Sequence, residues 1–294
     1  MEKYITLVNK YNFEFIKDID FNNFEIIQTG IGDILLVKLC FSNMLFKEKK
    51  ILFNLAIYID NPYGLNALNS FTFKIKLIKH FFNNNEIFFF YSPNISYTNW
   101  HKNVKYITNY NLLKPLVKKT YDNNKINNKY IIFHTKCRFY KSFNYSNLKD
   151  KLKEFFTKFK TNYTIILLGE KNMSKNYESN AHNITTIYDE LLLLKNNNTI
   201  FDLTIENIYN NLNFDNYIND IALIKNADYN IGVGHGGQYV NSILFGKKSF
   251  FFQKPILVNM LDINKLKNNN HISIFDLNKY LDFISNLAYK VINN

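Results

Sequence analysis

Residues 226–253 read NADYNIGVGHGGQYVNSILFGKKSFFFQ, and this stretch decides the fold class of the 294-residue chain. It holds five of the nine glycines: Gly232, Gly234, Gly236, Gly237 and Gly246. Its pattern predicts a strand over residues 229–233, a glycine turn, a short helix over 238–245 and a strand over 249–252. Such a turn leaves unpaired N–H groups at a helix N-terminus, where the helix dipole favours a phosphate. A tight turn without a ligand is the alternative.

Apolar, β-forming runs alternate with helical runs along most of the chain. Strands separated by helices of this length form parallel βαβ units. An Asn- and Lys-rich stretch over residues 118–130 is the candidate linker between two similar halves. We therefore predict an α/β protein of two Rossmann-like α/β/α domains that face a cleft, over residues 1–127 and 128–294.

The chain is basic, with a formal net charge of +12 and a pI near 9.3. This charge favours a polyanionic partner or an anionic membrane surface, unless the lysines reflect codon composition alone. The sequence carries no RNA-recognition aromatic motif and no zinc finger, which disfavours nucleic acid. Lys47, Lys49 and Lys50, with the lysines and aromatics that alternate over 71–82, mark a candidate membrane surface. The alternative is that these apolar residues form core and the lysines its solvated rim.

The two cysteines, Cys40 and Cys137, lie in apolar segments without metal-ligand spacing, so we expect reduced, buried thiols. Residues 1–15 contain no apolar signal region, and no apolar run reaches the length of about 18 residues that a membrane span needs. We expect a cytoplasmic protein, with peripheral association at a membrane as an open possibility.

Arg138 is the single arginine of a chain that otherwise uses lysine for its cations. Its planar guanidinium grips a phosphate or carboxylate at two points. It follows an apolar β run within YIIFHTKCRFY, residues 130–140, close to His134 and Lys136. Ligands of open α/β sheets gather at the carboxyl ends of the strands, so this position predicts an anion-binding role. A surface arginine without function is the alternative.

A second glycine turn lies in the first half, in QTGIGDILLVKLCFSNML, residues 28–45. Gly30 and Gly32 follow a predicted strand, Asp33 comes next, and a helix begins at once. Asp33 either caps this helix or acts as a general base in the cleft between the halves. The two roles compete for one carboxylate.

Five motifs follow one another along the chain: GIGDILLVK, LLGE (167–170), IFDLT (200–204), NYINDIALIKNADYNIGVGHGG and ILFGKKSFFF. Together they resemble the GT-B glycosyltransferases, most closely the heptosyltransferase-like family (glycosyltransferase family 9-like). The resemblance implies transfer of a hexosyl, heptosyl or fucosyl-type sugar from a nucleotide-diphosphate sugar to a glycan or glycolipid acceptor. It also implies an N-terminal acceptor-side domain, a C-terminal donor domain, and a reaction without metal or cofactor.

Residue by residue, the resemblance makes Asp33 the catalytic base and places a cation for the donor pyrophosphate at Lys136 or Arg138. FHTKCRF also resembles the HxR-type segment of GT-B fucosyltransferases, in which an arginine holds the donor diphosphate. The full predicted donor-binding set is Gly30, Gly32, His134, Lys136, Arg138, Gly169, Gly234, His235, Gly236, Gly237 and Gln238.

The chain departs from the family at its glycine turn, which usually reads D-x-G-x-x-H. Gly234 stands at the Asp position and Tyr239 at the His position. His235 and Gln238 lie close enough in sequence to substitute for the missing side chains. A catalytically degenerate sugar-nucleotide-binding protein therefore remains an alternative.

A dinucleotide-dependent oxidoreductase is the rival from another class, because Gly232, Gly234 and Gly237 satisfy G-x-G-x-x-G after a strand. That fingerprint needs an acidic residue about 20 positions later to hold the ribose. No acid occurs until Asp262, which disfavours this reading. The six histidines show no paired metal-ligand spacing, and the DxD match at residues 18–20 precedes the first strong strand, so we predict no metal site.

Overall fold

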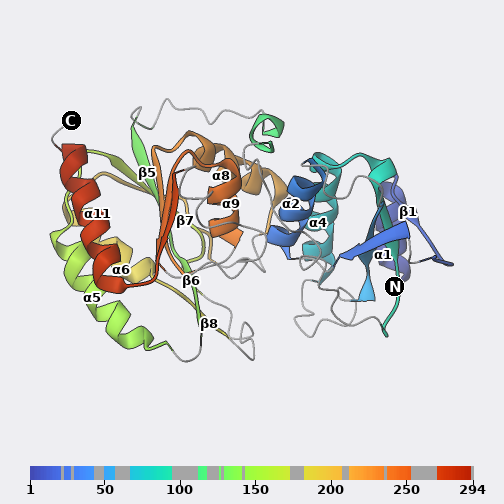
Figure 1. Ribbon diagram of the computed structural model, residues 1–294, viewed down its shortest axis with the longest axis horizontal. Helices are drawn as coiled ribbons and strands as arrows, with labels where there is room; N and C mark the ends of the chain where they lie inside the picture. Colours follow the sequence, from blue (N-terminus) through green and yellow to red (C-terminus); the bar gives the residue numbers. More distant parts are fainter. Residues whose placement is uncertain are drawn as a thin grey trace. The chain divides into compact units, whose positions relative to one another are not determined.

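The computed structural model describes residues 1–20, 23–27, 30–42, 50–56, 67–94, 112–117, 126, 129–140, 143–172, 182–206, 212–234, 237–252 and 270–292. The chain forms two compact units (Figure 1). The first comprises Met1–Leu116, Leu212–Tyr217 and Asn259–Asp262, and the second comprises Val117–Asn211, Ile218–Val258 and Ile263–Asn294. Most of the predicted linker over residues 118–130 lies outside the described residues.

The first unit contains a four-stranded parallel sheet of order β1-β4-β3-β2. Its central strands β3 and β4 are almost wholly buried and read as apolar runs, as strands covered on both faces do. The strands are β1 (Glu14–Phe15), β2 (Phe24–Ile27), β3 (Lys50–Asn54) and β4 (Ile87–Phe90), and the helices are α1 (Glu2–Lys10), α2 (Ile31–Ser42), α4 (Ala67–Phe81), η3 (Asn84–Glu86) and η5 (Lys114–Leu116).

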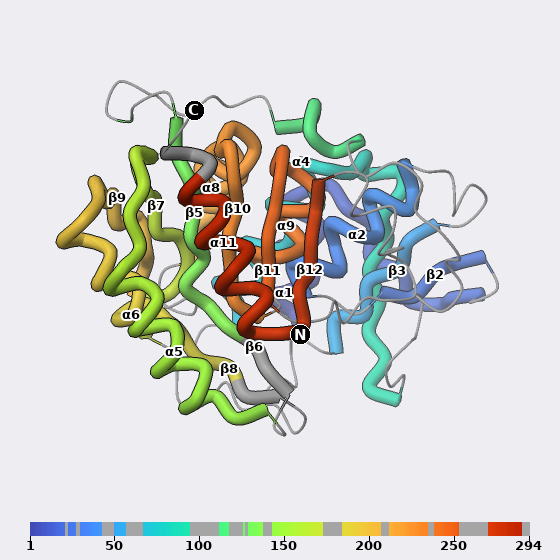
Figure 2. Tube along the Cα trace, turned by 60° about the vertical axis from the view of Figure 1, so that its left-hand side comes forward, coloured from blue at the N-terminus to red at the C-terminus, as the bar shows by residue number. Residues whose placement is uncertain are grey.

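The second unit contains a six-stranded parallel sheet of order β12-β11-β10-β5-β7-β9, which can be followed in Figure 2. Its strands are β5 (Tyr130–His134), β7 (Thr164–Leu168), β9 (Ile200–Asp202), β10 (Tyr229–Val233), β11 (Ser249–Phe252) and β12 (His271–Ile274). Beyond β5 the chain adds β6 (Lys136–Tyr140), which pairs antiparallel with β8 (His182–Thr186) in a separate ribbon.

Helices cover both faces of this sheet (Figure 1). One face packs through residues such as Phe133 and Ile165 against α5 (Tyr145–Lys158), α6 (Tyr188–Leu192) and α11 (Leu277–Ile292). The other face carries His134, Gly232 and Phe251 and meets α8 (Phe214–Asn226) and α9 (Gly237–Phe245). A short η7 (Leu193–Asn196) completes the unit. The predicted α/β class with parallel, Rossmann-like sheets is therefore confirmed.

Helix α4 contains most of the candidate membrane segment of the first half. Its apolar side chains, including Phe71, Phe73 and Phe81, are buried in the core. The core interpretation therefore holds for the apolar side chains, and these aromatics are not available to a membrane. Lys74 is itself partly buried, so it does not lie on a fully solvated rim. Lys47 and Lys49 lie outside the described residues, and Lys50 begins β3. Within the described ranges, no helix combines the length and apolarity required to cross a bilayer.

Candidate functional site

The glycine turn lies at the carboxyl edge of the second sheet, where β10 ends. Gly234 has a φ of 80°, a left-handed conformation that favours glycine, and its N–H donates to the carbonyl oxygen of Phe252 at 2.9 Å. Helix α9 begins at Gly237, with Gln238 half-buried in its first turn. His235 and Gly236 lie outside the described residues. The predicted strand and helix are present, and Gly234 leaves the strand in a left-handed conformation, so a helix N-terminus follows at the edge where ligands of α/β sheets bind.

Two of the five glycines in this stretch are explained by packing. At Gly232 a Cβ atom would collide with the ring of Phe251, and at Gly246 it would lie 2.5 Å from the carbonyl oxygen of Ser242. Glycine is required there because neighbouring groups fill the space. The number of glycines in this stretch is therefore weaker evidence for a ligand than the sequence indicates. Gly232, the first glycine of the G-x-G-x-x-G match, is explained by packing against Phe251.

His134 ends β5 and is fully buried. Its Nε2 lies 3.0 Å from the hydroxyl of Ser242 on α9, and its ring stacks on Phe251 at a centroid distance of 5.7 Å. Burial lowers the pKa of His134 to about 3, so the ring is neutral at pH 7. In this conformation the side chain has no exposed surface with which to contact a donor. It holds α9 against β5, directly behind the glycine turn.

Lys136 follows β5 and forms a buried ion pair with Glu170, which follows β7. The ammonium lies 2.7 Å from Oε2 of Glu170, and the side chains are 11% and 2% exposed. Gly169 has a φ of +119°, and a Cβ there would clash with the Thr135 side chain. The hydroxyls of Thr135 and Thr186 both donate to the carbonyl oxygen of Glu170, at 2.9 and 2.8 Å. Lys136, the residue predicted to bind the donor pyrophosphate, thus lies at the sheet edge, but its ammonium is already paired with the carboxylate of Glu170.

Arg138 lies in β6, where its backbone pairs with Ile184 of β8. The sequence indicated that Arg138 follows the strand that is now β5. In the structure Arg138 lies within β6, a second strand that continues beyond the edge of the six-stranded sheet. Its side chain is outside the described part of the structure. Its predicted contact with the donor stays a prediction.

A further polar cluster at the same edge was not assigned a role from the sequence. The hydroxyl of Tyr188 donates to Oδ2 of Asp202 at 2.6 Å, and Lys171 lies 3.8 Å from that oxygen and 3.7 Å from Oε1 of Glu206. Partial burial pushes the pKa of Asp202 upward, but hydrogen bonds from Thr204 and Tyr188 outweigh it and hold this pKa below its usual value. Asp202 lies in the IFDLT motif, which was the signal available in the sequence.

In the first unit, Asp33 occupies the third position of α2, after Gly32. Its Oδ2 accepts a hydrogen bond from the N–H of Gly30 at 2.9 Å, so the carboxylate caps the start of the helix. The capping role is therefore observed. The catalytic role stays a prediction, for a carboxylate that is half-buried rather than enclosed.

Two other ionisable groups have shifted pKa values that the sequence did not reveal. Burial lowers the pKa of Lys74 on α4 to about 8, and the charge of Asp33 opposes this shift. Burial raises the pKa of Asp220 on α8 to about 7. Perturbed groups of this kind gather at functional sites, so both extend the set to be tested. Among the described residues, no three His, Cys, Asp or Glu side chains are grouped to hold a metal ion.

Comparison with known proteins yields little. No family model and no curated protein matches the chain. Among solved structures, the chain is similar to HepE of Anabaena, whose crystal structure is in complex with UDP and glucose. The identity is 9%, the match covers 97% of this chain and 71% of that one, and the TM-score is 0.28.

Proposed function

We propose that this protein is a glycosyltransferase that moves a sugar from a nucleotide-diphosphate sugar to a glycan or glycolipid acceptor. The observation that carries the proposal is the left-handed turn at Gly234, which leads from β10 to the N-terminus of α9 at the carboxyl edge of a six-stranded parallel sheet. Backbone N–H groups and the helix dipole at such a place bind phosphate groups. The proposal assigns donor binding to residues 128–294 and acceptor binding to residues 1–127.

The donor diphosphate develops negative charge as its bond to the sugar breaks, and the reaction requires groups that stabilise this charge. In the proposal these are the backbone amides around Gly236 and Gly237, together with Lys136 and Arg138. Lys136 is paired with Glu170, so a bound diphosphate shares or displaces that carboxylate. Gly169 and His134 act indirectly, since one turns the chain toward Glu170 and the other holds α9 in place.

Asp33 is the proposed base that removes the proton from the acceptor hydroxyl. One carboxylate oxygen accepts the N–H of Gly30, which fixes the orientation of the group at the start of α2. A fixed carboxylate whose second oxygen reaches the acceptor fulfils the geometric demand on a general base.

A thermal-shift screen with UDP, GDP, ADP and CMP tests the proposal directly. A ligand present at 100 times its dissociation constant stabilises the folded protein by about 2.7 kcal/mol, so at least one nucleoside diphosphate is expected to raise the melting temperature. CMP controls for binding of the nucleoside and a single phosphate. If all four nucleotides leave the melting temperature unchanged at millimolar concentration, the proposed donor site is wrong.

Arg138→Ala is expected to weaken binding of the nucleoside diphosphate found in that screen by about 1.5–3 kcal/mol, because it removes a charge-assisted hydrogen bond to phosphate. Arg138→Lys is expected to restore only part of the affinity, since an ammonium lacks the two-point grip. Calorimetry on the folded variants measures both effects. Equal affinity in wild type and Arg138→Ala would remove this residue from the donor site.

A further inference from the structure

The amino edge of the second sheet, opposite the glycine turn, carries a row of exposed lysines. Lys129, Lys160 and Lys248 lie in the segments that enter β5, β7 and β11, and Lys195 lies in η7, the helix that precedes β9. Backbone hydrogen bonds hold two of them at the edge, because the carbonyl oxygen of Lys129 accepts from Thr164 and that of Lys248 accepts from Asn230. We call these four residues the lysine row.

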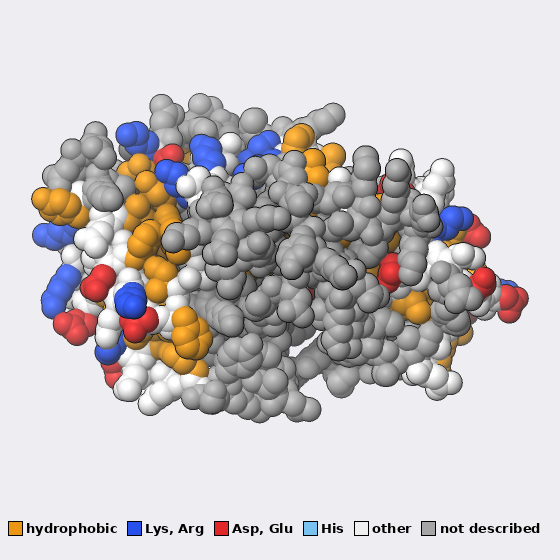
Figure 3. Space-filling view, viewed as in Figure 1, with side chains coloured by type: hydrophobic (Ala, Val, Ile, Leu, Met, Phe, Trp, Pro, Cys, Tyr) orange, Lys and Arg blue, Asp and Glu red, His pale blue; other side chains and the backbone are white. Residues whose placement is uncertain are grey.

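The row extends across neighbouring strands of one sheet. The strand order β11-β10-β5-β7-β9 places its four members beside four of five adjacent strands, with none beside β10. At about 4.8 Å between strands, the row spans roughly 20 Å. Figure 3 shows Lys and Arg side chains along the upper margin of the second unit, the side on which α11 ends in Figure 1.

Among the described residues at the amino edge of this sheet, lysines outnumber acids. Two further lysines, Lys247 and Lys158, lie near the lysine row. The nearby acids are Glu154, which pairs with Lys158, and Asp228. At the carboxyl edge, the described Lys136 contacts Glu170 and the described Lys171 contacts Asp202.

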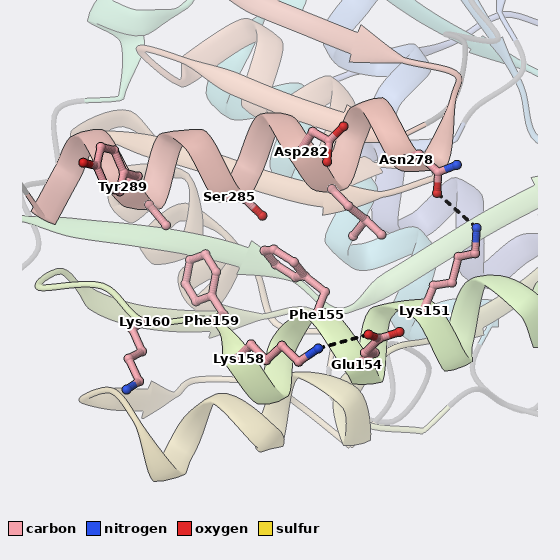
Figure 4. A pocket seen from close by; sticks show the side chains of 12 residues that line it. Lys151, Glu154, Phe155, Lys158, Phe159, Lys160, Asn278, Asp282, Ser285 and Tyr289 are labelled. Carbon is pink, nitrogen blue, oxygen red and sulfur yellow. Dashed lines mark hydrogen bonds and ion pairs between the residues drawn. The ribbon is translucent and has the colours of Figure 1, made fainter.

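Aromatic side chains accompany the row. Helix α11 runs back from the end of β12 toward the amino edge, and Tyr289 near its C-terminal end is 70% exposed. Tyr289 borders a groove of about 530 Å³ between α5 and α11, together with Lys158, Phe159 and Lys160 (Figure 4). At the row itself, the half-buried rings of Tyr163 and Tyr229 pack against each other, with the ammonium of Lys248 over the ring of Tyr229.

We propose that the lysine row, with Tyr289 beside it, docks the second unit onto an anionic lipid bilayer. Lysines attract an anionic leaflet, and tyrosines prefer the level of the lipid headgroups. Single-stranded nucleic acid is the less suitable occupant, because it requires several open rings on which successive bases stack. Tyr163 and Tyr229 pack on each other, and Tyr289 is the one exposed ring beside the row among the described residues. Strands of five residues hold the two edges roughly 17 Å apart, so a docked protein keeps its glycine turn clear of the lipid surface.

Vesicle co-sedimentation of the full chain tests the docking surface without a nucleotide ligand. Wild type is expected to bind phosphatidylcholine vesicles containing 30% phosphatidylserine strongly in 50 mM salt, and to bind pure phosphatidylcholine weakly. Each lysine contributes about fivefold to the partition coefficient, so changing Lys129, Lys160, Lys195 and Lys248 to Gln is expected to lower it at least a hundredfold. Raising the salt to 300 mM is expected to weaken wild-type binding.

The matched control carries Gln at Lys3, Lys10, Lys76 and Lys279, four exposed positions outside the row. This control has the same net charge as the row variant, and its partition coefficient is expected to fall by less than about fivefold. Equal losses in the two variants, or wild type that binds both vesicles alike, would overturn the proposal. It is equally overturned if the row variant loses affinity for a single-stranded oligonucleotide while vesicle binding is unchanged from wild type.

Discussion

Asp33→Asn is expected to lower sugar-transfer turnover by about 10²–10⁴ while leaving nucleotide affinity unchanged. The amide retains the shape of the carboxylate and an oxygen that accepts the N–H of Gly30, so the helix cap is preserved. It cannot take a proton from the acceptor hydroxyl, and a positioned general base contributes a rate factor of this size. The measurement is turnover with the donor identified in the nucleotide screen, beside donor affinity by calorimetry.

Asp33→Ala separates the two roles of this residue. Loss of the cap is expected to cost about 1 kcal/mol of stability, a cost that Asp33→Asn avoids. If Asp33 is only a cap, Asp33→Asn transfers sugar at the wild-type rate and only Asp33→Ala is impaired, through its stability. That outcome would move the search for the base to other groups, of which Lys74 is coupled to the same carboxylate.

Lys136→Met is expected to lower the free energy of unfolding by about 3–5 kcal/mol. The change removes the ammonium that lies 2.7 Å from Glu170 and leaves a carboxylate that is 2% exposed without its counter-charge. A buried charge that loses its partner retains the full cost of its lost hydration, which is the reason for the large effect. Urea unfolding followed by circular dichroism measures it.

Two further variants make this prediction specific. Lys136→Met combined with Glu170→Met is expected to recover most of the lost stability, because an apolar pair of similar volume replaces both charges. Lys158→Met in the exposed pair with Glu154 is expected to change stability by no more than about 0.5 kcal/mol. A single Lys136→Met variant as stable as wild type would show that the ion pair contributes nothing to folding.

The glycine turn shows what local sequence predicts well. Strand β10, the turn at Gly234 and helix α9 were all readable, because apolar runs, glycine and helix-forming residues act over a few positions. The sequence did not show that the two glycines are required for different reasons. Gly234 adopts a left-handed backbone conformation, whereas Gly232 leaves room for the ring of Phe251 in the neighbouring strand.

Other elements were not predicted. The sequence indicated neither the short strand β12 nor the ribbon of β6 with β8, whose paired residues Lys136 and Thr186 are 50 positions apart. It also gave no sign that Leu212–Tyr217 and Asn259–Asp262 group with the first unit. Short strands acquire their stability from pairing with distant segments, so their own residues carry a weak signal.

The sequence by itself determined the α/β class and the order of most strands and helices, because hydrophobic periodicity and turn residues are local properties. It offered the cap at Asp33 as one of two roles, and the structure shows the capping hydrogen bond. Only the tertiary structure decided that His134 is buried against Ser242, that Lys136 is paired with Glu170, and that lysines preceding separate strands form one row. Burial and charge pairing depend on which segments pack together, and a parallel sheet brings together residues that are distant in the chain.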